Sequence, residues 1–131
     1  MIDEKRRILF DTDILIGYFR KRPEIKDIID KVKRSEIEAF ISAITEAEIY
    51  SGSLKDDDDL RIEALLSYFH RIPVDSGIAK RAGKLRAKYF KKYRLRTPDA
   101  LIAASAEKMS LVLMTKNLKH FEFIEEIQLA K

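Results

Sequence analysis

The sequence predicts an α/β fold, a three-layer sandwich with a mostly parallel central sheet of about five strands. Short apolar runs typical of buried strands alternate along the chain with longer segments whose apolar residues recur at helical spacing. Strands that alternate with helices pair in parallel through right-handed crossovers, which places helices on both faces of the sheet. The 131 residues, 46% of them apolar, suit a single domain covering residues 1–131.

Five segments read as strands: residues 8–10, 37–41, 72–74, 111–114 and, more weakly, 127–130. Three apolar stripes with the i, i+3, i+4, i+7 spacing of an amphipathic helix lie between them. These stripes are Ile25, Ile28, Ile29 and Val32; Ile62, Leu65, Leu66 and Phe69; and Ile78, Ala82, Leu85 and Tyr89. The acidic run at 56–59 is expected to begin a helix, because acids favour helix N-termini.

Composition excludes several classes of protein. The chain has no cysteine, so it has neither disulfides nor thiolate metal sites. Its longest nearly apolar run, ALIAASA at 100–106, is far shorter than the roughly 20 residues that span a bilayer. The first residues, MIDEKRR, lack the apolar stretch of a secretory signal, so a cytoplasmic location without membrane attachment is expected.

Two aspartates interrupt the most apolar stretch of the chain, ILFDTDILI at 8–16. A carboxylate near a core stays charged only when cations or hydrogen-bond donors compensate for the lost water. In parallel sheets, ligands bind beyond the carboxyl ends of the strands. Asp11 comes just after the first predicted strand, so its carboxylate is expected at that ligand-binding edge.

Glu48, Asp99 and Asn117 also follow predicted strands or begin the helices behind them. Each has a purely local explanation. Thr45 and Glu48 match a capping box, Asp99 lies in the first turn of a helix that Thr97 would cap, and Asn is a common turn residue. Local capping does not require all of them to reach the same edge of the sheet, however. Their convergence with Asp11 favours a functional cluster.

Three carboxylates and an amide oxygen form a set of hard oxygen ligands. Mg²⁺ and Mn²⁺ prefer such ligands in octahedral geometry and keep several waters. Zinc is disfavoured, because the chain has no cysteine and only two histidines. The sequence therefore predicts a Mg²⁺ or Mn²⁺ site.

Four spaced motifs carry a family resemblance that covers nearly the whole chain in the same order. They are DTDILI at 11–16, T-x-x-E-x-x-x-G at 45–52, PDALIAA at 98–104, and T-x-N at 115–117 followed by an aromatic residue. Together they resemble the PIN-domain ribonucleases, specifically VapC-type toxins. The resemblance implies a metal-dependent endoribonuclease that hydrolyses RNA phosphodiester bonds, as the toxin of a type II toxin-antitoxin pair. It also implies a cognate antitoxin that packs across the active site, and a homodimer.

By this resemblance, Asp11, Glu48 and Asp99 are the acidic metal ligands of the catalytic site, and Asn117 occupies the fourth ligand position. Thr115 matches the polar residue beside it. The reaction implied is metal-assisted hydrolysis by water, in which either Glu48 or Asp99 could accept the proton.

One position departs from the family pattern. Many relatives have Asp before an aromatic residue where this chain has His120 before Phe121. With one carboxylate fewer, a second metal ion would be held weakly. We interpret His120 as an exposed loop residue rather than a catalytic one.

Thr12 and Asp13 are expected to support the site from outside the ligand set. Thr12 is predicted to hydrogen-bond the site. Asp13 is either an outer ligand or the N-cap of the helix that follows, and the cap is the favoured interpretation.

Residues 78–98 hold nine Lys and Arg residues, three interleaved aromatics and no acid. Such a helix leading into Asp99 would attract an RNA backbone, and a tyrosine could stack on an unpaired base. The alternative is a solvated helix face with aromatics in the core. The candidate RNA-binding residues are Lys84, Lys88, Lys91, Arg94 and Arg96.

Two other functions fit parts of the pattern. A non-catalytic RNA-binding PIN-like module would have lost its fourth ligand, and Asn117 keeps that possibility open. A phosphoryl-accepting receiver domain would use Asp75 as acceptor, with Thr115 and Lys116 as partners. The receiver function leaves Glu48 and Asp99 without a role.

Overall fold

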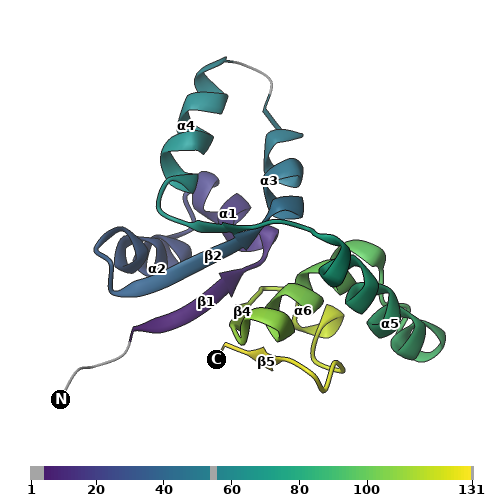
Figure 1. Ribbon diagram of the computed structural model, residues 1–131. Helices are drawn as coiled ribbons and strands as arrows, with labels where there is room; N and C mark the ends of the chain where they lie inside the picture. The colour runs from purple at the N-terminus through teal and green to yellow at the C-terminus, as the bar shows by residue number, and fades with distance from the viewer. Residues whose placement is uncertain (1–4, 54–55, 131) are drawn as a thin grey trace.

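A computed structural model describes residues 5–53 and 56–130 of the chain (Figure 1). Residues 1–4, part of the N-terminal segment considered above, lie outside the described residues. No helix within the described ranges is long and apolar enough to cross a membrane.

The centre of the fold is a sheet of five parallel strands in the order β3-β2-β1-β4-β5. This confirms the predicted α/β class, and every pairing is parallel. The strands are β1 (Arg6–Phe10), β2 (Ile37–Ser42), β3 (His70–Ile72), β4 (Val112–Met114) and β5 (Gln128–Leu129). The third strand was expected at 72–74, but it ends at Ile72 because Pro73 has no N–H to donate to the sheet.

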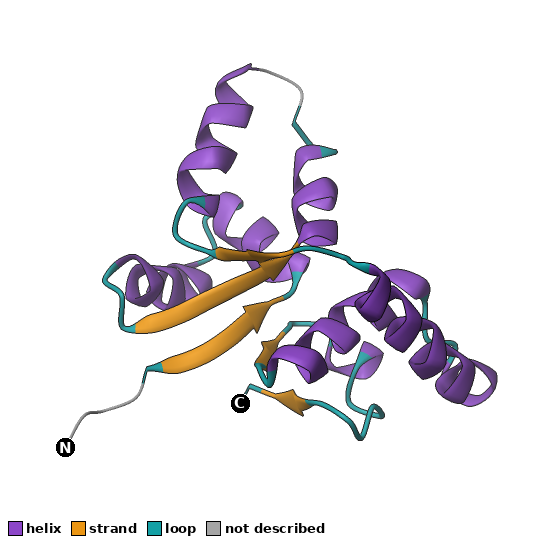
Figure 2. Ribbon diagram, in the orientation of Figure 1, coloured by secondary structure: helices purple, strands orange, loops and turns teal. Residues whose placement is uncertain are grey.

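Helices cover both faces of the sheet (Figure 2). They are α1 (Thr12–Phe19), α2 (Pro23–Lys33), α3 (Ala43–Tyr50), α4 (Asp56–Leu66), α5 (Ser76–Tyr93) and α6 (Thr97–Met109), with a short 3₁₀ helix η1 (Leu118–His120). The acidic run at 56–59 begins α4, as predicted. Helix α3 projects from the end of β2, and α4 runs back beside it towards β3 (Figure 1).

The side-chain alternation of β1 separates two hydrophobic cores. Ile8 and Phe10 face one side, where they pack with residues of α1, α2 and α4, while Leu9 faces the core formed with α5 and α6. The three apolar stripes read from the sequence supply much of both cores. The sandwich is therefore three layers deep, as predicted.

The central strand fixes where the polar residues of the site meet. β1 pairs with β2 on one side and β4 on the other. Beyond the last paired residues, the Asp11 N–H donates to the Met114 carbonyl at 2.9 Å. The chain segments that follow β1 and β4 therefore leave the sheet side by side.

Candidate active site

Asp11 lies at the carboxyl end of β1 and is only 6% exposed. It is the N-cap of α1, and its carboxylate accepts hydrogen bonds from Thr12 N–H and from the Thr115 hydroxyl, both at 2.8 Å. The prediction that Asp13 is the cap is therefore wrong by two positions. The chain turns into α1 directly after the strand, which gives the cap to the first aspartate.

Asp13 lies in the first turn of α1 and faces the loop after β4. Its Oδ2 accepts from the Lys116 N–H at 2.9 Å and lies 3.4 Å from the Thr115 hydroxyl. Its Oδ1 is buried and has no hydrogen-bond partner among the described residues. Burial raises the pKa of this carboxyl, and the Lys116 N–H partly offsets that rise. Asp13 therefore holds the loop against α1 and leaves one oxygen unsatisfied.

Glu48 is connected to the same edge through Thr12. The Thr12 hydroxyl donates to Glu48 Oε1 at 2.7 Å and lies 3.1 Å from the buried Thr45 hydroxyl. The predicted capping box is wrong, because α3 begins at Ala43 and its N-cap is Ser42, whose hydroxyl accepts from Ile44 N–H. Thr12 therefore contacts one of the predicted ligands, and its support of a metal site stays a prediction.

Asp99 enters the site from α6 and is 8% exposed. The helix begins at Thr97 itself and has Arg96 at its N-cap position, so the predicted Thr97 cap is wrong by one residue. Asp99 Oδ2 lies 3.4 Å from both Nε and Nη2 of Arg96, and 3.6 Å from His120 Nδ1. Its carboxylate is therefore flanked by two nitrogen-bearing side chains.

His120 is exposed, as expected, but its position facing Asp99 could not be predicted from the sequence. The short helix η1 turns the chain after Asn117 and brings His120 back towards α6. A three-residue 3₁₀ turn has too little periodicity to be read from sequence.

Asn117 reaches the site through its backbone. Its N–H donates to the Thr115 hydroxyl oxygen at 3.0 Å, while its side chain is exposed and does not cap η1. Thr115 thus contacts Asp11, Asp13 and Asn117 with one oxygen atom. Metal ligation by the Asn117 side chain stays a prediction.

The electrostatics of the cluster are unbalanced towards negative charge. Burial raises the pKa of the Asp11 carboxyl from its ordinary 3.8 to about 6; the Thr115 hydroxyl opposes this rise, and the charges of Asp13 and Asp99 add to it. Neighbouring carboxylates destabilise one another's ionised forms unless a cation is present. A bound cation would therefore favour the ionised form of the buried Asp11 carboxylate.

The chemistry of these residues fits a divalent cation. Their donors are carboxylate oxygens, one of which, Asp13 Oδ1, is buried and unsatisfied. Within the two described ranges, however, no three Asp, Glu or His side chains are gathered closely enough to form a ligand set. Glu48 is turned to Thr12, and Asp99 to Arg96 and His120. The metal site predicted from Asp11, Glu48, Asp99 and Asn117 therefore stays a prediction.

The candidate RNA-binding residues differ in how available they are. Lys84 and Lys91 are exposed on α5, whereas Lys88 donates to Glu126 at 2.9 Å. Arg94 ends α5 in the left-handed conformation, with its guanidinium 5.3 Å from the centre of the Phe90 ring. Arg96, described above, is the member of this set that reaches the acidic cluster.

The interleaved aromatics of α5 are partly core residues. Tyr89 is buried and its hydroxyl donates to Glu126, as expected from the alternative interpretation, in which the aromatics of this helix belong to the core. Tyr93 is 43% exposed and stacks on Phe123, with ring centres 4.3 Å apart and planes 2° from parallel. Base stacking by Tyr89 is therefore excluded in this conformation.

Asp75 does not lie where a phosphoryl acceptor would need it. It caps α5 after the edge strand β3, accepts from Ile78 N–H and pairs with Lys108. β2 and β1 separate β3 from β4, which carries Thr115 and Lys116 at its end. The receiver alternative is therefore wrong.

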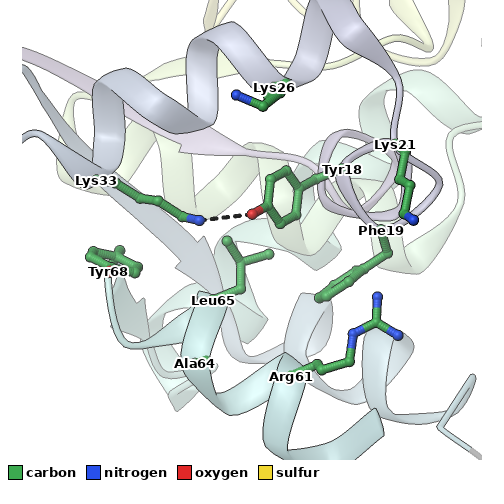
Figure 3. A pocket seen from close by; sticks show the side chains of 9 residues that line it. All are labelled: Tyr18, Phe19, Lys21, Lys26, Lys33, Arg61, Ala64, Leu65 and Tyr68. Atoms are coloured by element: carbon green, nitrogen blue, oxygen red, sulfur yellow. Dashed lines mark hydrogen bonds between the residues drawn. The ribbon is translucent and has the colours of Figure 1, made fainter.

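A separate hollow lies between α1, α2 and α4 (Figure 3). Tyr18, Phe19 and Leu65 form its apolar part, and the Lys33 ammonium donates to the Tyr18 hydroxyl at 2.7 Å. Its other charged lining residues, Lys21, Lys26 and Arg61, are also cations. Because none of the described residues that line it is a carboxylate, this hollow does not share the chemistry of the acidic cluster.

The chain is similar to known proteins in sequence and in fold. The profile of the PIN domain family matches residues 8–125. Ribonuclease VapC10 of Mycobacterium tuberculosis is 31% identical over 122 residues, which cover 92% of this chain and 90% of that protein.

Solved structures are similar over nearly the full chain. A chain of a toxin-antitoxin complex from Klebsiella pneumoniae is 35% identical with a TM-score of 0.76, covering 92% of this chain and 94% of that one. VapBC2 from Rickettsia felis, bound to a DNA fragment from its promoter, has a TM-score of 0.81 over 95% of this chain and 97% of that one. At 24% identity, this second likeness bears on the fold alone.

Proposed function

The chain belongs to the PIN-domain family and to its VapC ribonucleases, and from that premise we propose that it is a single-domain endoribonuclease that hydrolyses RNA with Mg²⁺ or Mn²⁺. The observation that carries the proposal is the acidic cluster around the buried Asp11 carboxylate at the end of β1, where the charges of Asp13 and Asp99 raise the pKa of Asp11. A nearby cation favours the ionised form of such a carboxylate.

A divalent cation held by this cluster would supply activated water and stabilise negative charge on the scissile phosphate. Asp11 and Asp99 supply buried carboxylates for it, and Glu48 supplies a third from α3. Thr115 and Thr12 fix the orientation of these side chains. Either Glu48 or Asp99 is available to accept the proton of the attacking water.

We further propose that the protein is the toxin of a toxin-antitoxin pair. The support is the likeness to a chain of the Klebsiella pneumoniae toxin-antitoxin complex. We also propose that the protein acts in the cytoplasm, where RNA and a protein antitoxin would be available to it. Pairing of two copies, which the family resemblance implies, stays a prediction.

The proposed function is tested by cleavage of a labelled, structured RNA by antitoxin-free protein. We expect cleavage with Mg²⁺ or Mn²⁺, none in EDTA, and none by Asp99→Asn. Asp75→Asn is the matched control, because that acid is exposed at another helix N-terminus and Asn also caps helices. Asn117→Ala measures how far the fourth position contributes. Binding of RNA without cleavage in either metal would instead identify a non-catalytic module.

Replacing Thr12 by Val is expected to lower the cleavage rate by roughly 10- to 100-fold, the usual effect of losing a residue that orients a metal ligand. The reason is that Glu48 loses the hydroxyl that holds it at 2.7 Å. Single-turnover rates at saturating Mn²⁺ measure the effect. Thr12→Ser keeps the hydroxyl and should retain activity. Equal rates for the Val variant and the wild type would show that Glu48 does not depend on Thr12.

A further inference from the structure

Arg96 makes a contact that is unusual for a residue in a basic RNA-binding stretch, because it reaches into the acidic cluster. Both Nε and Nη2 lie 3.4 Å from Asp99 Oδ2. The Arg96 side chain is 66% exposed, whereas the Asp99 side chain is 12% exposed. An exposed cation therefore lies beside one of the carboxylates that the proposed function assigns to the metal.

This contact is weak enough to be exchanged for another. Both distances are at the long end of the hydrogen-bond range, and exposed ion pairs contribute little to stability. Asp99 also lies in the first turn of α6, where the helix dipole stabilises its charge independently of Arg96. The charged forms of Arg96 and Asp99 therefore do not require their contact with each other.

The guanidinium group suits a second anion equally well. Arg stays charged at all relevant pH values, and its planar fork matches both carboxylate and phosphate oxygens. Of the other basic residues, Lys88 is held by Glu126 and Lys116 by Glu24. Among the described residues, Arg96 places a permanently charged group beside Asp99, next to the His120 imidazole.

We propose that Arg96 alternates between two anions: it competes with the divalent cation for Asp99, and it binds an RNA phosphate once the cation holds Asp99. This inference rests on the proposed function. Binding of the metal to Asp99 would release the Arg96 guanidinium for an RNA phosphate, and binding of the phosphate would release Asp99 for the metal. Each ligand therefore increases the affinity for the other by the same factor.

The first test is the affinity for Mn²⁺ in the absence of RNA, measured by isothermal titration calorimetry. Arg96→Gln should bind Mn²⁺ roughly two- to fivefold more tightly than the wild type, the range expected from removing an exposed competing ion pair. Lys80→Gln, which removes an exposed charge from the first turns of α5, should leave the affinity near that of the wild type. Arg96→Lys keeps the charge without the fork and should fall between wild type and Arg96→Gln.

The second test is RNA binding, measured by fluorescence anisotropy with a fluorescein-labelled single-stranded RNA in Ca²⁺ and in EDTA. The wild type should gain affinity when Ca²⁺ replaces EDTA, and Arg96→Gln should lose most of that gain. Tighter Mn²⁺ binding by Arg96→Gln, together with a smaller gain in RNA affinity on adding Ca²⁺, would show that Arg96 moves between the two anions. Simple loss of a positive charge would weaken RNA binding equally in Ca²⁺ and in EDTA.

The two possible failures are distinguishable. If wild type and Arg96→Gln bind Mn²⁺ equally while the wild type cleaves RNA in a metal-dependent manner, the role of Arg96 is overturned and the proposed function stands. If the wild type binds no Mn²⁺, the metal-dependent function is overturned, and the exchange with it.

Discussion

Asp11→Asn is expected to abolish RNA cleavage and, in a chelating buffer, to make the folded protein more stable. Removing one charged ligand should lower the cleavage rate roughly a thousandfold or more, because metal-ion stabilisation of the transition state amounts to several kcal/mol and each 1.36 kcal/mol is a factor of ten. The free energy of unfolding should increase, because the ionised Asp11 carboxylate is buried and poorly compensated in the folded protein.

The pH dependence follows from the raised pKa of Asp11. Its ordinary value is 3.8 and its value in the folded protein is about 6. Well below pH 3.8 the carboxyl is protonated in both the folded and unfolded states. As pH rises through 4 to 6, the unfolded chain releases its proton first, so the folded state loses up to about 3 kcal/mol by pH 7. Asn mimics the protonated carboxyl and removes this loss.

Urea denaturation in EDTA at several pH values measures the effect. The stabilisation by Asn should be largest near pH 7 and should shrink towards zero at pH 4. Asp75→Asn is a control of opposite sign, because hydrogen bonds from Ile78 N–H and Lys108 lower the pKa of that exposed carboxyl. A less stable Asp11→Asn protein at pH 7 would mean that the hydrogen bonds from Thr12 and Thr115 outweigh the burial.

Leu95→Ala is expected to destabilise the protein by about 3 kcal/mol and to lower its melting temperature by roughly 10 °C. Leu95 is 2% exposed and belongs to the core formed by α5, α6 and the sheet. It is the apolar anchor of the short segment between these two helices, with Arg94 on one side and Arg96 on the other. Truncation leaves a cavity directly behind the start of α6.

Thermal denaturation followed by circular dichroism tests this expectation. Leu60→Ala is the matched control, because Leu60 is 65% exposed on α4 and its loss should change stability by less than about 0.5 kcal/mol. Equal melting temperatures for the two variants would show that the segment before α6 is not anchored through Leu95.

The sequence predicted the parts of the molecule that depend on periodicity and on strand order. Asp11 was recognised because it breaks an apolar run where a parallel sheet presents its ligands, and the structure places it at that edge. Helix starts were predicted less well. Ser42, Asp11 and Arg96 take positions assigned to Thr45, Asp13 and Thr97, because tertiary contacts decide which of several possible capping residues begins a helix.

Contacts between side chains that are far apart in the chain could not be predicted from the sequence. The pairing of Thr12 with Glu48 and of His120 with Asp99 depends on rotamers and on a short 3₁₀ turn. Neither leaves a periodic signal. The same is true of Arg96, which read as one of several basic residues although it faces a carboxylate.

The joining of β1 to β4 also sets when the acidic cluster can form during translation. The Asp11 N–H donates to the Met114 carbonyl, and the Asp11 carboxylate accepts from the hydroxyl of Thr115, which lies 104 residues further along the chain. Long-range pairing of this kind forms late, because most of the chain must be made before the two segments can meet. During translation, Asp11 is therefore made long before Met114 and Thr115, the distant residues that hydrogen-bond to it. Until β4 and the residues after it emerge, the Asp11 carboxylate lacks the Thr115 hydroxyl that donates to it in the folded protein.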